Sequence, residues 1–338
     1  MTGPAETDRM TITSGRTPSH PPGRRTAAST RPAAPVTRRP TPAALPLLAA
    51  GVTMLLWASA FIAIRAVGEH YSPGAMALGR LVVGGLVLTV VAALRPVTLP
   101  RGRTLALVVA YGALWFGLYT LSLNAAEQDL DAGTAALIVG VGPILIAVLA
   151  GIWLREGFPR GLVTGVVVAF AGVVAIGIGT STGQRTTLGV LLALVAAGLY
   201  AAGVLLQKQA LAGTQPLPAT WLGCLAGAAT CLPFAPALVR EVGTAPTTAT
   251  LGIVYMGLFP TAIAFLTWTY ALSHTSAGRL AASSYVVPAL TVVLSWLLLD
   301  EVPVPLAFVG GALCLIGVAI SRLPDGVRLR RRSGRTPS

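Results

Sequence analysis

Long uncharged stretches dominate the chain from residue 45 to residue 321, and charged residues gather in the short segments between them. A bilayer core about 30 Å thick needs about 20 apolar residues for each helical crossing. Ten stretches of about this length predict ten transmembrane helices. They are Leu45–Val67, Pro73–Leu94, Thr104–Leu123, Ala132–Leu154, Pro159–Gly179, Leu188–Gln207, Leu217–Val239, Thr250–Leu272, Arg279–Leu299 and Val304–Ser321. The short connections leave no room for a soluble catalytic domain, so the pattern predicts an all-α integral membrane protein.

Composition and charge placement agree with this interpretation. Of the 338 residues, 54% are hydrophobic and only 10% are charged, unlike the balance of a soluble domain. The net charge of +13 comes mostly from arginines in the two tails and in the expected inner loops, which places both termini in the cytoplasm. The loops expected outside carry acidic residues, namely Glu69, Glu127, Asp129, Asp131, Asp300 and Glu301. We therefore expect the lipid bilayer, and no nucleic acid, as a partner.

The chain divides into four parts. Residues 1–42, rich in Pro, Thr and Arg, predict a disordered basic cytoplasmic tail, and residues 323–338 predict a second basic cytoplasmic tail. Residues 43–182 and 183–322 each hold five predicted helices. Lys208 is the sole lysine, and basic content that comes almost entirely from arginine indicates a GC-rich bacterial genome. We expect the protein in the cytoplasmic membrane. The three cysteines lie in predicted spans without metal-ligand spacing, so we expect no metal and no cofactor.

The two five-helix parts resemble each other. A shift of 145 positions aligns the third to fifth spans with the eighth to tenth without a gap. The matches include Pro143 with Pro288, Glu156 with Glu301 and, in a weaker alignment of the first spans at a shift of 143, Trp57 with Tyr200 and Arg65 with Lys208. Because five is an odd number, the second repeat would cross the membrane in the opposite sense to the first. Inverted repeats are typical of secondary transporters, whose substrate site lies near the bilayer midplane.

A known family shares these features. The run Trp57-Ala58-Ser59-Ala60-Phe61 resembles the W-x-S-x-F signature of the EamA family in the drug/metabolite transporter superfamily. The resemblance covers about residues 45 to 321 and continues through Arg80, Pro143, Glu156, Tyr285, Pro288, Glu301, Gly310 and Gly317. It implies a ten-helix bundle in which the first, third, fourth, sixth, eighth and ninth helices surround a central cavity. It also implies export of amino acids, drugs or other metabolites, with a small-molecule substrate as the partner.

Aromatic residues form a helical stripe on the third predicted span. Tyr111, Trp115, Tyr119 and Ser122 are spaced by four, four and three residues, which places them on one helix face. Aromatic residues that face lipid usually sit at the two interfaces, so a stripe across the membrane favours an interior position. Trp57 on the first span and Tyr200 on the sixth would add aromatic side chains to the same interior wall. Such walls suit amphipathic solutes, although ordinary helix packing is the alternative for each residue.

Two prolines and one arginine complete the candidate site. Pro143 and Pro288 predict helix kinks that free the carbonyls of Val139 and Ser284, and Ser284 and Tyr285 would form a polar patch beside the second kink. Arg80 is the one strong charge well inside a predicted span, so we expect it to face the bundle interior. It would attract a substrate carboxylate or form a structural pair with Glu69 or with backbone carbonyls.

We therefore predict a secondary transporter that exports small metabolites, such as amino acids or amphipathic drugs, by alternating access. The alternatives are a channel, for which the sequence offers no filter-like loop, and an intramembrane enzyme. The enzyme alternative lacks His, Asp or Glu groups gathered inside the spans to act as nucleophile and base. Coupling stays open between uniport, exchange and a proton route through Glu69 or the loop from Glu127 to Asp131. The glycines of the spans would allow close packing between helices of the bundle or, alternatively, a contact between two copies in a homodimer.

Overall fold

The computed structural model describes residues 44–153, 184–275, 286–301 and 304–321, with scattered positions within 164–178 and 277–284. All regular elements in these ranges are helical, and no strand occurs among them, which confirms the all-α class. The predicted tails, the fifth predicted span and the start of the ninth lie wholly or largely outside the described residues.

Six continuous helical segments are long and apolar enough to cross a bilayer. They are α1 (Ala44–Val67), α2 (Pro73–Ala93), α3–η1–α4 (Gly102–Tyr111, Gly112–Tyr119, Thr120–Ala126), α8 (Gln184–Ala210), α9–η2–α10 (Pro216–Cys231, Leu232–Phe234, Ala235–Thr244) and α11–η3–α12 (Thr247–Met256, Gly257–Ile263, Ala264–His274). Shorter apolar helices are α5 (Ala132–Val139), α6 (Gly142–Trp153), α14 (Val286–Leu299) and α15 (Pro305–Ser321). Each overlaps a predicted span.

Local sequence explains several helix starts. Pro73 and Pro216 occupy the first turns of α2 and α9, where a missing N–H removes no helical hydrogen bond. Asp131 caps α5, because its carboxylate accepts a hydrogen bond from the Thr134 backbone N–H at 2.8 Å. The predicted fourth span is interrupted between Val139 and Gly142, directly before Pro143.

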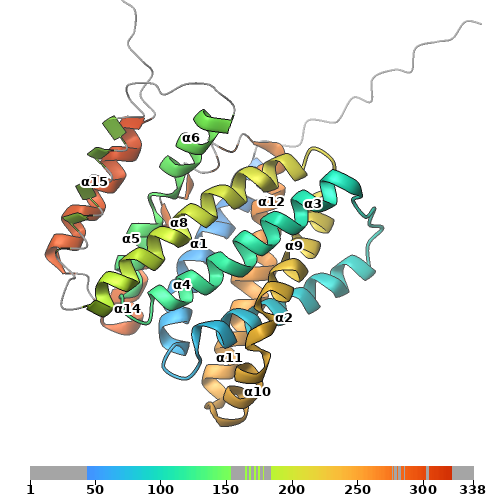
Figure 1. Cartoon of the computed structure of the whole chain (residues 1–338), viewed down its shortest axis with the longest axis horizontal. Helices are drawn as coiled ribbons and strands as arrows, with labels where there is room; N and C mark the ends of the chain where they lie inside the picture. Colours follow the sequence, from blue (N-terminus) through green and yellow to red (C-terminus); the bar gives the residue numbers. More distant parts are fainter. Residues whose placement is uncertain are drawn as a thin grey trace, which may run out of the picture. The chain divides into compact units, whose positions relative to one another are not determined.

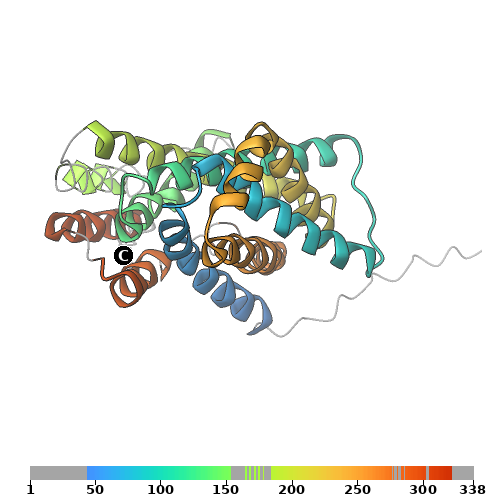
Figure 2. The ribbon, with the colours of Figure 1, turned by 90° about the horizontal axis from the view of Figure 1, so that it is seen from below.

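Segments from the two halves of the chain alternate in the bundle. The helix α1 packs against α12 and α14, α2 packs against α9 and η3, and α8 packs along α3, η1 and α4 (Figure 1). Figure 2 shows the same helices after a quarter turn, with α15 beside α6 and α14 near α5. Side chains such as Leu55, Leu86 and Leu191 are more than half exposed, as expected of helices that face lipid.

The third crossing of each half contains one π-helical segment. The segment η1 begins at Gly112 and η3 begins at Gly257, two positions that are related by the same shift that aligns the halves. Gly112 lies against the backbone of Gly223 in α9, and Gly257 lies against the Arg80 carbonyl in α2. In both places the missing side chain lets the third crossing of one half approach the second crossing of the other.

Candidate functional site

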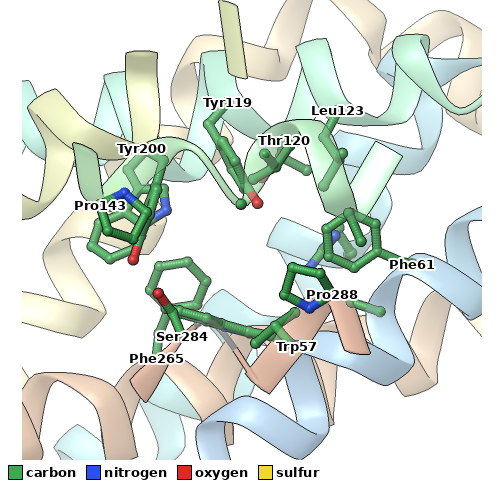
Figure 3. Close-up of a pocket in the computed structure, with 17 residues that line it drawn as sticks. Trp57, Phe61, Tyr119, Thr120, Leu123, Pro143, Tyr200, Phe265, Ser284 and Pro288 are labelled. Carbon is green, nitrogen blue, oxygen red and sulfur yellow. The ribbon is translucent and has the colours of Figure 1, made fainter. Parts of the chain in front are cut away.

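A single cavity brings together residues from most of the described helices. The space between its lining side chains, counted together with its opening to the outside, measures about 660 Å³. Its walls come from α1, α2, η1, α4, α5, α6, α8, α12 and the segment at the start of α14 (Figure 3). The lining residues are Trp57, Ala60, Phe61, Arg80, Trp115, Tyr119, Thr120, Leu123, Ala136, Val139, Gly140, Pro143, Tyr200, Phe265, Ser284, Val287 and Pro288.

Aromatic rings form a continuous wall. The ring centroids of Trp57 and Trp115 are 5.9 Å apart, and those of Trp115 and Tyr200 are 5.3 Å apart. Tyr119 lies 6.4 Å from Tyr200, and Phe265 lies 5.4 Å from Trp57. Most of these pairs are tilted or edge-to-face, the arrangements that aromatic rings prefer. In Figure 3, Tyr119 and Leu123 face Trp57 and Pro288 across the space.

Arg80 supplies the positive charge of the cavity. Its side chain is 6% exposed, and its Nε donates a hydrogen bond to the Thr261 hydroxyl in η3 at 3.0 Å. The alternative pair with Glu69 is not observed, since Glu69 is exposed and Arg80 bonds to Thr261 instead. Among the described residues that line the cavity, Arg80 is the sole formally charged one, and none is a carboxylate. The cavity therefore favours an anionic group over a cationic one.

A second donor lies beside the same cavity. The indole Nε1 of Trp57 is buried and has no hydrogen-bond partner among the described residues. Trp268 stacks behind Trp57 with ring centroids 4.8 Å apart, but its Nε1 donates to Gln207 Oε1 at 3.1 Å. A buried N–H without a partner is unfavourable, so a ligand oxygen that accepted a hydrogen bond from Trp57 would relieve this cost.

The prolines line the cavity, but the predicted free carbonyl is absent at the second one. The Val287 N–H donates to the Ser284 carbonyl at 3.0 Å, so the prediction that Pro288 leaves this carbonyl free is wrong. A turn contact replaces the lost helical bond because α14 begins at Val286, two residues before Pro288. Ser284 lines the cavity, while Tyr285 lies outside the described residues.

The aromatic stripe of the third span enters the cavity only in part. Trp115 and Tyr119 line it, whereas the Tyr111 hydroxyl donates to the Ala219 carbonyl in α9 and its ring packs beside Gly223. Tyr111 is therefore buried, as the stripe predicted, but it packs against α9 and does not line the cavity. The π-helical segment η1 follows Tyr111 and extends to Tyr119. A π-helix has more residues per turn than the α-helix that the predicted stripe assumed.

Several lining residues were not predicted. Phe265 contributes a full ring to the wall, and Thr120 and Ala136 contribute small surfaces. The shift of 145 positions aligns Thr120 with Phe265, so the two repeats place both residues at equivalent positions of the wall. Within the described residues, no group of three or more His, Cys, Asp or Glu could hold a metal ion.

Apolar crossings around an aromatic cavity define a multi-pass membrane protein with an internal site. The EamA-like transporter family matches the chain twice, over residues 44–178 and 187–323, and the chain belongs to this family. The two matches confirm the resemblance drawn from the Trp57 to Phe61 run and from the later motifs. The protein is therefore a membrane transporter of the EamA type.

Individual relatives agree with this assignment. The chain is 37% identical over 289 residues to a protein of Streptantibioticus cattleyicolor named "Probable terminal-alkyne amino-acid exporter", covering 85% of this chain and 95% of that protein. It is 34% identical to the uncharacterized transporter YdfC of Bacillus subtilis, covering 79% and 88% of the two chains. A crystal structure that is 20% identical aligns with a TM-score of 0.59 and covers 83% of this chain and 97% of its own, which supports the fold.

Proposed function

We propose that this transporter exports amphipathic solutes that carry a carboxylate, such as amino acids with apolar side chains, across the cytoplasmic membrane. The observation that carries the proposal is the pairing of one buried cation, Arg80, with an aromatic wall and no described lining carboxylate. Arg80 would bind the carboxylate and the Trp57 Nε1 would donate a second hydrogen bond. Trp115, Tyr119 and Tyr200 would hold the apolar part of the solute, and Ser284 would add a polar contact. Tyr285 stays a predicted contact outside the described residues.

The transport cycle would be alternating access between two inverted five-helix repeats. The repeated π segments and the contacts that Gly112 and Gly257 make across the halves support such a symmetry. With ten crossings, both termini would lie in the cytoplasm. The relative that is named as an amino-acid exporter supports the solute class, because it is 37% identical over most of both chains.

The test uses purified protein in liposomes that are preloaded with unlabelled leucine and phenylalanine. Exchange against external labelled phenylalanine is expected, while phenethylamine, which keeps the ring and lacks the carboxylate, should compete poorly. Exchange that requires solute on both sides identifies a carrier, whereas a channel would not show it. Equal competition by phenethylamine would contradict a site built around Arg80.

Arg80 variants sharpen the assignment. A charged hydrogen bond contributes about 1.5–3 kcal/mol, so Arg80→Gln should weaken apparent phenylalanine affinity by about tenfold or more. Arg80→Lys keeps the charge and should retain a preference for phenylalanine over phenethylamine. Thr261→Val removes the partner of Arg80 Nε and leaves the charge in place. A preference that survives in Arg80→Gln would remove this residue from the site.

A further inference from the structure

Glu127 is a buried carboxyl group directly outside a membrane crossing. It follows the crossing Gly102–Ala126 and is 1% exposed. Both carboxylate oxygens are buried and have no hydrogen-bond partner among the described residues. Burial raises the pKa of the Glu127 carboxyl well above its ordinary value, and the nearby Arg65 guanidinium opposes this rise only in part. The neutral, protonated form is therefore favoured in this conformation.

Charged groups from four segments act on this carboxyl. They are Arg65 on α1, Arg80 on α2, Asp131 at the start of α5 and Glu301 before α15. The two other acids are already bound: Asp131 accepts from Thr134, and Glu301 accepts from Arg65 Nε at 2.7 Å. Of these three acids, Glu127 alone has a carboxylate without a hydrogen-bond partner in the described part of the chain.

The Arg65 guanidinium lies between Glu127 and Glu301. Its Nε donates to the Glu301 carboxylate, and its Nη1 donates to the Glu127 backbone carbonyl at 3.3 Å. Arg65 belongs to the first family match and Glu301 to the second, so this ion pair ties the two repeats together. An ionised Glu127 would offer the same guanidinium a second carboxylate.

Glu127 also lies on the helix face that lines the cavity. Thr120, Leu123 and Glu127 are spaced by three and four residues, which places them along one face, and the first two line the cavity. Asn124 lies three residues before Glu127, and its Oδ1 is a buried acceptor without a partner in the described residues. Two buried polar groups without a partner among the described residues thus lie one helical turn apart along the chain.

We propose that Glu127 is the proton-binding site of this transporter, and that proton release from it loosens the Arg65–Glu301 contact between the repeats. When Glu127 is protonated, Arg65 is held by Glu301 alone and the contact between the repeats stays intact. When the proton leaves, the two carboxylates compete for Arg65, and the tie between the repeats weakens. The coupling of this step to solute movement rests on the transport function proposed above.

The experiment compares the wild type with Glu127→Gln, which copies the protonated carboxyl in size and charge. The matched control is Glu69→Gln, the same substitution at an exposed acid that is also expected on the outer side. Two assays run in parallel in liposomes: exchange of labelled phenylalanine at equal pH, and accumulation of the same solute under an imposed pH difference. We expect Glu127→Gln to keep exchange and to lose the stimulation by the pH difference, while Glu69→Gln keeps both.

A stability titration in detergent provides a readout that does not depend on transport. A carboxyl whose pKa is higher in the folded state stabilises the protein fully below its ordinary pKa, and this contribution is lost as pH rises through the folded-state pKa. From about pH 5 to about pH 8, the melting temperature of the wild type should therefore fall relative to that of Glu127→Gln. Glu69→Gln should follow the wild type.

The outcomes separate the two proposals. Wild-type protein that exchanges no solute would overturn the proposed function, and the stability titration would then decide the proton site by itself. Exchange by the wild type together with undiminished pH stimulation in Glu127→Gln would overturn the proton site and leave the transport function standing. A melting temperature of Glu127→Gln that parallels the wild type across this pH range would also overturn it.

Discussion

The two family repeats share a scaffold but place different chemistry on it. Trp57 and Tyr200 occupy aligned positions, and their ring centroids lie 6.3 Å apart in the cavity. The position aligned with Arg80 is Gly223, which carries no charge and packs against the backbone of Gly112. Aligned aromatic residues thus build the walls from both repeats, while the buried cation comes from the first repeat alone. The aligned positions form the walls of the cavity. The lining position at which the repeats differ in charge, Arg80 against Gly223, favours an anionic group.

A second aligned pair shows the same division. Arg65 donates to the carbonyl of Glu127, and Lys208 donates to the carbonyl of Leu272 at 2.7 Å. Glu127 and Leu272 are aligned by the shift of 145 positions, so the two cations make equivalent backbone contacts. The first repeat places a titratable carboxyl at this position, and the second places a leucine. The proposed proton site therefore has no counterpart at the aligned position of the second repeat.

The largest expected effect tests the shared scaffold. A Cβ atom at Gly112 would lie 2.7 Å from the Gly223 Cα, closer than two carbon atoms can approach. Gly112→Ala should therefore lower the free energy of unfolding by about 3 kcal/mol, because backbone on both sides must move. Gly257→Ala should behave alike, since its Cβ would lie 2.7 Å from the Arg80 carbonyl oxygen. Thermal unfolding in detergent measures both.

Gly198→Ala is the control for this pair. No heavy atom lies within 4 Å of a Cβ built at Gly198, so the change should be tolerated and should stabilise the helix by up to about 1 kcal/mol. Gly112 and Gly257 variants with clearly different losses would show that the two crossings are not equivalent in their packing.

A smaller effect separates the two stacked tryptophans. Trp268→Phe leaves the buried Gln207 Oε1 without its donor and should cost about 1–3 kcal/mol of stability. Trp57→Phe removes an N–H that has no partner among the described residues, so it should spare stability and weaken phenylalanine exchange instead. Unfolding and exchange measured on the same preparations test this split. Equal stability losses would mean that Trp57 Nε1 is bonded in the resting protein.

The smallest effect concerns the ion pair between the repeats. The side chains of Arg65 and Glu301 are 38% and 23% exposed, and partly exposed pairs contribute about 0.2–1 kcal/mol. A double-mutant cycle with Arg65→Gln and Glu301→Gln should return a coupling energy in this range. The same cycle with Lys208→Gln and Glu301→Gln should return none, because Lys208 bonds to carbonyls of Leu272 and Thr275. Equal coupling in both cycles would indicate a long-range effect rather than a contact.

Much of the architecture was predictable because it depends on local composition. The length of an apolar stretch decides whether a helix can cross a bilayer, and the described crossings begin and end within a few residues of the predicted ones. Aromatic residues at Trp57, Trp115, Tyr119 and Tyr200 were expected in the interior, and all four line the cavity. The doubled family match also follows from motifs that can be read along the chain.

Other features of the site depend on contacts between distant segments. Tyr111 fits the predicted stripe and is buried, yet its hydroxyl donates to the Ala219 carbonyl in α9, a contact that spacing along one helix cannot predict. The Ser284 carbonyl was expected to be free, but the start of α14 brings the Val287 N–H to it. Thr261 received no role before the fold placed it at Arg80 Nε.

The sequence by itself determined that this protein is a helical membrane transporter of the EamA family, because hydropathy, helix length and motif order are properties of consecutive residues. Only the tertiary structure decided which polar groups lack partners. Glu127 lies in an acidic loop that looks solvent-exposed in the sequence, and the fold buries it beside Arg65 and Glu301. Burial and pairing depend on what neighbouring helices bring to the same place, and those neighbours are far away along the chain.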